Sequence, residues 1–187
     1  MYYNYDAYKK ARDTAWKTLI ECNVNCLPVP LADICTFYNA KILLNSDLST
    51  NKLGSGEKGK TVFVNSQYFI IVDDSNSVPV QRYTIAHEIG HICLNHFNNQ
   101  IQDRDREEYE AERFAIDLLA PACVLWGINL HTADEIAVAC NISLQSSKIR
   151  EECMKVLYER DKFLTSPLER QVSNQFKDFI EKTNNFK

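Results

Sequence analysis

Two histidines four residues apart, His87 and His91, form the pattern in this chain with the clearest capacity for chemistry. They lie in the stretch His87-Glu88-Ile-Gly-His91, which a helix would arrange with both imidazoles one turn apart on the same face. Zn²⁺ accepts two histidine ligands at this spacing. Glu88 is rotated by about 100° from His87, so its carboxylate would lie beside the metal and could accept a proton from an activated water. The pattern therefore predicts a zinc site with Glu88 as the general base.

The residues around the two histidines favour a metal site over a chance alignment. The alternative is a pair of core histidines and an exposed glutamate that happen to follow this pattern. Apolar side chains cover the opposite side of the same stretch and predict a largely buried helix; they are Ile85, Ala86, Ile89, Ile92, Cys93 and Phe97. Imidazoles turned toward a buried layer need partners, and a metal ion would supply them.

A catalytic zinc site needs a third protein ligand and one open position. One class of zinc peptidases finds a third histidine by extending the motif, but the positions where it requires glycine and histidine hold Leu94 and Phe97 here. His96 is rotated by about 140° from His91 and is interpreted as a boundary or surface histidine. The third ligand must therefore come from another element.

The stretch 107–121 carries four glutamates, which a helical wheel separates into two faces. Glu108 and Glu112 fall on the apolar face, whereas Glu110 and Asp117 fall on the opposite face, which we expect to be solvated. Carboxylates on an apolar face require a cationic partner. A zinc ligand at Glu108 and a partner at Glu112 that orients a ligand histidine would satisfy this requirement. The alternative for both residues is an ion pair with an arginine or lysine elsewhere.

Two blocks of this sequence together resemble the signature blocks of the ImmA/IrrE family of zinc metallopeptidases: Ala86-His-Glu-Ile-Gly-His91 and Glu108-Tyr-Glu-Ala-Glu-Arg-Phe-Ala-Ile-Asp-Leu-Leu-Ala-Pro121. The resemblance implies a gluzincin-like domain over residues 1–130, with zinc held by His87, His91 and Glu108 and with Glu88 as general base. Family members typically carry Asp or Asn at the position of Glu112.

The same resemblance implies a hydrolase with a defined biological role. It would be an endopeptidase, encoded on mobile elements or in stress-response systems, that cuts a helix-turn-helix transcriptional repressor and so acts as an anti-repressor. The residues by themselves lead only to metal-assisted hydrolysis of an amide bond. A further oxyanion donor would be needed, and Tyr83, Tyr109 and His131 are candidates by residue type alone.

The elements that must position these residues form a mainly helical α+β chain with a small β-hairpin or sheet. We expect helices over residues 6–21, 31–38, 79–97, 107–120, 122–127, 132–140, 143–160 and 167–183. Extended runs at 41–44, 61–64 and 68–72 predict strands, the last two forming a hairpin across a polar turn. A polar loop is expected at 98–106. The strand at 68–72 is the hypothetical edge along which an extended substrate would pair.

Residues 131–187 are predicted to form a helical extension after the metallopeptidase domain, with a helix-turn-helix-like unit at 132–160. Thr132 and Glu135 fit a capping box, and Asn141 tolerates the left-handed conformation of a turn. Acidic and basic residues balance in this unit, which makes a poor phosphate-contact surface. We therefore expect it to pack or to dock a partner, and DNA binding is disfavoured.

The composition narrows the class of protein. The chain has 187 residues, of which 45% are hydrophobic, and a net charge of −4, which excludes a disordered tail and argues against a general polyanion-binding surface. No apolar run reaches the roughly 20 residues that span a bilayer, and the first residues lack the apolar core of a signal peptide. Seven irregularly spaced cysteines favour reduced thiols over a disulfide framework. These features predict a cytoplasmic protein without a membrane partner and leave its oligomeric state open.

Three functional hypotheses follow. The first is a zinc endopeptidase whose protein substrate is a repressor. The second is a regulator that binds DNA through residues 131–160 and carries a vestigial metal site. The third is a partner-binding module in which zinc is structural, which would require four protein ligands and no open coordination position.

Overall fold

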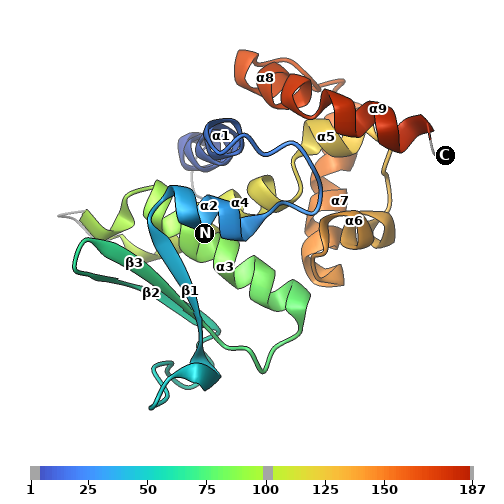
Figure 1. The fold of residues 1–187 in the computed structure, drawn as a ribbon. Helices are drawn as coiled ribbons and strands as arrows, with labels where there is room; N and C mark the ends of the chain where they lie inside the picture. Colours follow the sequence, from blue (N-terminus) through green and yellow to red (C-terminus); the bar gives the residue numbers. More distant parts are fainter. Residues whose placement is uncertain (1–4, 99–102, 186–187) are drawn as a thin grey trace.

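The computed structural model describes residues 5–98 and 103–185, which form a mainly helical chain with one small sheet (Figure 1). The strands are β1 (Ala40–Leu44), β2 (Gly59–Val64) and β3 (Gln67–Val72). The helices are α1 (Tyr5–Glu21), α2 (Leu31–Phe37), α3 (Val78–Cys93), α4 (Arg104–Leu119), α5 (Ala122–Gly127), α6 (Ala133–Cys140), α7 (Leu144–Glu159), α8 (Pro167–Gln175) and α9 (Lys177–Asn185). This architecture confirms the predicted fold class, α+β and mainly helical with a helical C-terminal part.

The sheet has the strand order β1-β3-β2. β2 and β3 form the predicted antiparallel hairpin, and β1 pairs with β3 in parallel, Ala40 opposite Tyr68. Because β1 occupies the second side of β3, the prediction that the run 68–72 offers a free edge is wrong. The apolar character of this run reflects a central strand, in which Ile70 and Val72 are fully buried. Among the described strands, the free edge beside α3 belongs to β2.

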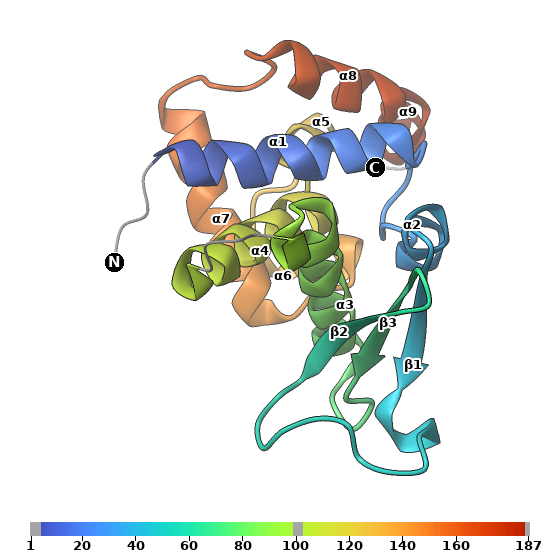
Figure 2. The same ribbon diagram turned by 90° about the vertical axis from the view of Figure 1, so that its left-hand side faces the viewer.

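α3 and α4 pack against each other at the centre of the molecule, and Figures 1 and 2 show them between the sheet and the C-terminal helices. Gly90 of α3 permits their close approach. A Cβ atom at this position would lie 3.0 Å from Cδ1 of Phe114 and 3.2 Å from Cα of Ala111, which is tighter than ordinary van der Waals contact. The short distance between the helix backbones brings the residues of α3 and α4 that face the cleft within reach of one another.

α1 crosses the other side of α4 (Figure 2), so α4 is buried on two sides. This arrangement makes the wheel prediction for α4 wrong. Glu110 and Asp117, expected on a solvated face, are 1% and 3% exposed, whereas Glu108 and Glu112, expected on the buried face, are exposed. The wheel located the apolar stripe that meets α3, but it gave no sign of the second neighbour that covers the polar face.

The C-terminal helices keep the local features expected from the sequence. α6 begins with the predicted capping box between Thr132 and Glu135, and Asn141 after it has a left-handed φ of 51°. α7 follows and is tied to α4 by a buried ion pair, in which Nη2 of Arg150 lies 2.6 Å from Oδ1 of Asp117. The division of the chain at residue 130 and the functional role of the helix-turn-helix-like unit stay predictions.

Three helix boundaries differ from expectation. α4 begins at Arg104, inside the loop predicted at 98–106, because Asp103 caps it by accepting a hydrogen bond from the backbone N–H of Arg106. The helix predicted to reach residue 97 ends at Cys93, because Asn95 takes a left-handed φ of 60° and a 3₁₀ turn follows at His96–Asn98. The single helix predicted over 167–183 is two helices that meet at the buried Phe176. Part of the predicted loop, residues 99–102, lies outside the described residues. Within the described ranges, we find no helix with the length and apolar character needed to cross a membrane.

Candidate active site

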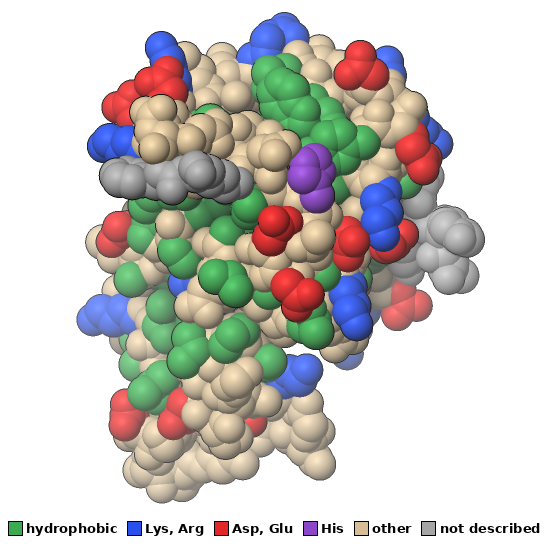
Figure 3. Space-filling model, turned by 90° about the vertical axis from the view of Figure 1, so that its right-hand side faces the viewer, with side chains coloured by type: hydrophobic (Ala, Val, Ile, Leu, Met, Phe, Trp, Pro, Cys, Tyr) green, Lys and Arg blue, Asp and Glu red, His purple; other side chains and the backbone are tan. Residues whose placement is uncertain are grey.

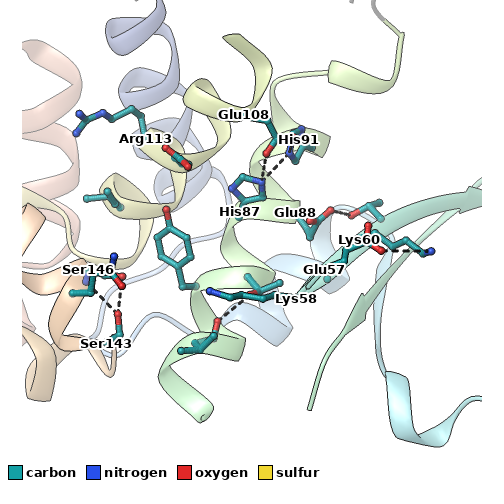
Figure 4. A pocket seen from close by; sticks show the side chains of 18 of the residues that line it. Glu57, Lys58, Lys60, His87, Glu88, His91, Glu108, Arg113, Ser143 and Ser146 are labelled. Atoms are coloured by element: carbon teal, nitrogen blue, oxygen red, sulfur yellow. Dashed lines mark hydrogen bonds and ion pairs between the residues drawn. The ribbon is translucent and has the colours of Figure 1, made fainter. Parts of the chain in front are cut away.

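His87 and His91 project from one side of α3, and Glu108 reaches them from the first half of α4 (Figure 4). The two Nε2 atoms of the histidines are 3.0 Å apart. Glu108 places Oε2 3.2 Å from Nε2 of His87 and Oε1 3.6 Å from Nε2 of His91. Within residues 5–98 and 103–185, this is the one group of His, Cys, Asp or Glu side chains close enough together to hold a metal ion. The structure therefore brings together the three residues that the sequence proposed as ligands.

The spacing of these atoms fits a tetrahedral metal ion. Nitrogen and oxygen ligands about 2.0–2.2 Å from such an ion lie about 3.3–3.6 Å from one another, and the three pairs here span 3.0 to 3.6 Å. Two imidazoles and one carboxylate are donors that suit a borderline divalent metal. Three protein ligands would also leave one coordination position for water or substrate.

The protonation states of two of these side chains, His91 and Glu108, suit this role. Burial, followed by the nearby His87, lowers the pKa of His91 to about 4, so this imidazole is neutral at pH 7. A hydrogen bond from His87 lowers the pKa of Glu108 and keeps its carboxyl ionised. Metal ligands must be deprotonated, so His91 and Glu108 are already in the required form.

Glu88 is buried between α3 and the sheet, beside the three potential ligands. Oγ1 of Thr61 in β2 donates a hydrogen bond to Oε2 of Glu88 at 2.8 Å. Burial raises the pKa of Glu88, and this hydrogen bond opposes the rise in part. A carboxylate with a raised pKa takes up a proton more readily near neutral pH, as a general base must. Thr61 could not be identified from the sequence, because strand periodicity does not show which strand residue faces a neighbouring helix.

A cleft of about 770 Å³ opens over these side chains. Its walls come from β2 and the loop before it, from α3 and α4, and from the start of α7. Figure 4 shows Ser143 and Ser146 at the start of α7 on one side of the cleft and Lys58 beside β2 on the other. Apolar side chains, among them Ile116 and Ile149, line it together with charged ones. An open cleft of mixed polarity suits a segment of polypeptide better than a small apolar ligand.

His96 is the functional-site residue that the sequence analysis placed wrongly. It is 5% exposed and not a surface residue. Its Nδ1 atom lies 2.9 Å from Nδ1 of His91, and its Nε2 atom lies 3.2 Å from Oε2 of Glu110. A helical rotation angle applies only within one continuous helix, but the chain turns at Asn95 and returns His96 toward α4. Asparagine is a common residue in the left-handed conformation, so Asn95 was the available signal.

Of the remaining candidates, Tyr83 lines the cleft, where burial and then the charge of Glu112 raise its pKa to about 12. Tyr109 lies under the guanidinium of Arg113, and His131 packs on a tyrosine ring in the C-terminal part. Glu112 itself lines the cleft and is exposed. Its role as the partner of a ligand histidine stays a prediction. The structure places a different residue, His96, next to the ligand histidine His91.

In a comparison with protein families, residues 42–150 match the IrrE N-terminal-like domain of the Peptidase_M78 family. A search of curated proteins found no relative of this chain. The matched range covers more than half of the chain. It includes β1 from residue 42 onward, all of β2, β3, α3 and α4, and every residue described above as a potential metal ligand or base. The chain therefore belongs to the IrrE N-terminal-like domain family, Peptidase_M78.

Proposed function

We propose that this protein is a zinc-dependent endopeptidase that hydrolyses a peptide bond in a protein substrate. The observation that carries the proposal is the position of Glu88. Its carboxylate is buried beside a group of two histidines and one glutamate with metal-ligand spacing, and all of them line one open cleft. Membership of a peptidase family supports the same reaction.

In this mechanism the protein positions the water, the base and the peptide. Zinc, when held by His87, His91 and Glu108, lowers the pKa of a water molecule toward about 7 and polarises the scissile carbonyl. Glu88 removes a proton from the attacking water and delivers it to the leaving amine. Thr61 keeps one oxygen of Glu88 in place through its hydrogen bond, so that the other oxygen is free to accept the proton. Tyr83, which keeps its phenolic proton, borders the same cleft.

The free edge of β2 supports an extended polypeptide as the substrate. Backbone N–H and C=O groups on an edge strand can pair with a peptide added as a further strand. β2 lines the cleft through Gly59, Lys60 and Thr61, so a peptide paired there would pass close to Glu88. This arrangement replaces the earlier hypothesis that the run 68–72 binds the substrate.

We further propose that the substrate is a helix-turn-helix repressor and that the protein acts as an anti-repressor in a mobile-element or stress-response system. The support for this step is the resemblance of the two signature blocks to the ImmA/IrrE family. A cleft wall built from the start of α7 would contact such a substrate beside the scissile bond.

Two features disfavour the DNA-binding alternative. The first residues of α7, which a helix-turn-helix protein would insert into the major groove, line the cleft with Ser146 and Ile149. Figure 3 views the side on which α6, α7 and α9 lie, and basic and acidic side chains alternate on that face. A surface that neutralises several phosphates requires clustered Lys and Arg. The structural-zinc alternative is disfavoured because the donor group among the described residues has three members and not four.

The test is cleavage of a helix-turn-helix repressor, chosen from the products of neighbouring genes, with Glu88→Gln as the decisive variant. The wild-type protein should release defined fragments, and Glu88→Gln should bind zinc normally but cleave at least about 100-fold more slowly, the lower range for general-base catalysis. Glu152→Gln, an exposed glutamate of α7 outside the cleft, is the matched control and should cleave at the wild-type rate. Equal cleavage by Glu88→Gln and wild-type protein would contradict the mechanism.

A further inference from the structure

A buried network of hydrogen-bonded side chains lies behind His91 and takes no part in the mechanism above. His96 contacts His91 on one side and Glu110 on the other, at 2.9 and 3.2 Å. Glu110 also accepts hydrogen bonds from Nζ of Lys10 at 2.7 Å and from Nε of Arg106 at 2.8 Å. This hydrogen-bond network thus connects α1, α4 and the turn after α3 to His91, a potential metal ligand.

The chemistry of these groups fixes the direction of each hydrogen bond. Glu110 receives two cationic donors, so its carboxylate accepts and Nε2 of His96 must carry the proton that it donates to Glu110. In a neutral imidazole the other nitrogen then has a lone pair, so Nδ1 of His96 accepts from Nδ1–H of His91. With its proton on Nδ1, His91 presents the lone pair of Nε2 toward Glu108 and His87. This is the tautomer that a metal ion at the site requires.

The hydrogen-bond network is buried, and burying its charged groups costs the protein free energy of folding. The side chains of His96 and Glu110 are 3% and 2% exposed, and a buried carboxylate is unfavourable without charged or hydrogen-bonded partners. Lys10 belongs to α1, which precedes the family match at residues 42–150. An element outside the matched domain therefore supplies one of the charges that keep Glu110 in place.

We propose that His96 and Glu110, held by Lys10 of α1, position the imidazole of His91 for metal binding. This inference rests on the metal site of the proposed function, but not on the substrate or on cleavage. The outer partners of ligand histidines set the tautomer and the ring orientation, and their removal typically weakens metal binding by about 10- to 100-fold.

The experiment measures zinc affinity of the full-length protein by competition with a chromophoric chelator, and the absorption spectrum of the Co²⁺-loaded form. His96→Leu and Glu110→Gln should each weaken Zn²⁺ binding by about 10- to 100-fold and should alter the Co²⁺ spectrum. His96→Gln, which keeps a donor and an acceptor in one planar group, should recover part of the affinity lost in His96→Leu.

Asp117→Asn is the matched control for Glu110→Gln. Both variants turn a buried carboxylate of α4 into an amide, but Asp117 pairs with Arg150 and does not touch the three potential ligands. Both should lower the free energy of unfolding of the metal-free protein, whereas only Glu110→Gln should weaken Zn²⁺ binding. This comparison separates positioning of the ligand from general stability.

Lys10→Met tests the contribution of α1 in a variant that should fold, because the side chain of Lys10 is half exposed. It should weaken Zn²⁺ binding by about two- to fivefold, the range expected for a partly exposed ion pair. Lys9→Met, the exposed neighbour on the same helix, should leave the affinity unchanged.

The proposal is overturned if His96→Leu and Glu110→Gln bind Zn²⁺ within twofold of the wild-type protein, or if Asp117→Asn loses as much affinity as Glu110→Gln. Its failure is distinct from failure of the proposed function. A wild-type protein that binds zinc through this network but cleaves no repressor would contradict the function and leave the positioning role intact.

Discussion

The two sides of α4 carry carboxylates in opposite environments. Glu108, on the cleft side, has a side chain that is 60% exposed, and its near neighbours are the imidazoles of His87 and His91. The side chain of Glu110, two residues later, is 2% exposed and receives hydrogen bonds from Lys10 and Arg106. On the same buried side, Asp117 pairs with Arg150. Within α4, the two buried carboxylates, Glu110 and Asp117, are neutralised by Lys or Arg side chains of the protein, whereas the cleft carboxylate Glu108 pairs with neither.

This difference explains why a metal ion would bind at the cleft side of α4 and not at its buried side. Glu110 and Asp117 need partners that are present as soon as the chain folds, because an unpaired buried charge is strongly destabilising. A carboxylate at an open cleft remains hydrated and tolerates the absence of a partner. The cleft side of α4 can therefore exchange a metal ion with solvent, while the buried side holds the helix and its neighbours in register.

The largest effect on folding is expected where the buried side loses a cation. Arg150→Met would leave Asp117 unpaired in the interior and should lower the free energy of unfolding by about 3–5 kcal/mol, measured by urea denaturation. Adding Asp117→Leu should restore most of the loss, because an apolar pair removes the uncompensated charge. A loss below about 1 kcal/mol in Arg150→Met would show that water reaches Asp117 and that the two sides of α4 do not differ as described.

The second prediction concerns the contact that brings the cleft residues together. Gly90→Ala places a methyl group against Phe114 and the backbone of Ala111. We expect a loss of about 1–3 kcal/mol in the free energy of unfolding, as for other overpacked sites, together with weaker Zn²⁺ binding because α4 moves away from α3. Gly54→Ala, whose added Cβ would make only ordinary contacts, is the control for both measurements. Unchanged metal affinity in a destabilised Gly90→Ala would show that the site tolerates the shift.

The smallest effect is expected on the cleft side. Glu112→Ala removes an exposed carboxylate and should change the free energy of unfolding by no more than about 0.5 kcal/mol. Glu110→Ala in the same helix should be much more destabilising, since it strands Lys10, Arg106 and His96. Thermal denaturation of the two metal-free variants measures both losses of stability. Equal losses in Glu112→Ala and Glu110→Ala would contradict the difference between the two sides of α4.

The sequence predicted what depends on neighbours within one element. The spacing of His87 and His91, the hairpin, the capping box at Thr132 and the turn at Asn141 all follow from local geometry, and the structure contains each of them. The apolar periodicity of α3 correctly indicated a helix that is largely buried.

The errors concern what depends on a second neighbour. A helical wheel shows which side of α4 is apolar, but it does not reveal that α1 covers the polar side with Lys10, nor that α7 brings Arg150 to Asp117. The ion pairs with Lys or Arg form at Glu110 and Asp117. Among the described residues, none forms at Glu108 or Glu112, for which this alternative was predicted. The place of His96 was missed for a similar reason, since one left-handed residue redirects the chain and invalidates any rotation angle counted across it.

The most direct test of the central claim is the zinc content and zinc affinity of the purified wild-type protein and of Glu108→Ala. We predict about one zinc per chain for the wild-type protein, and an affinity at least about 100-fold lower for Glu108→Ala, beyond the usual effect of an outer partner. The metal-free variant should keep the wild-type free energy of unfolding within about 0.5 kcal/mol, because the replaced side chain is exposed. A wild-type protein that folds but binds no zinc, or a Glu108→Ala variant that binds it as tightly, would contradict the account.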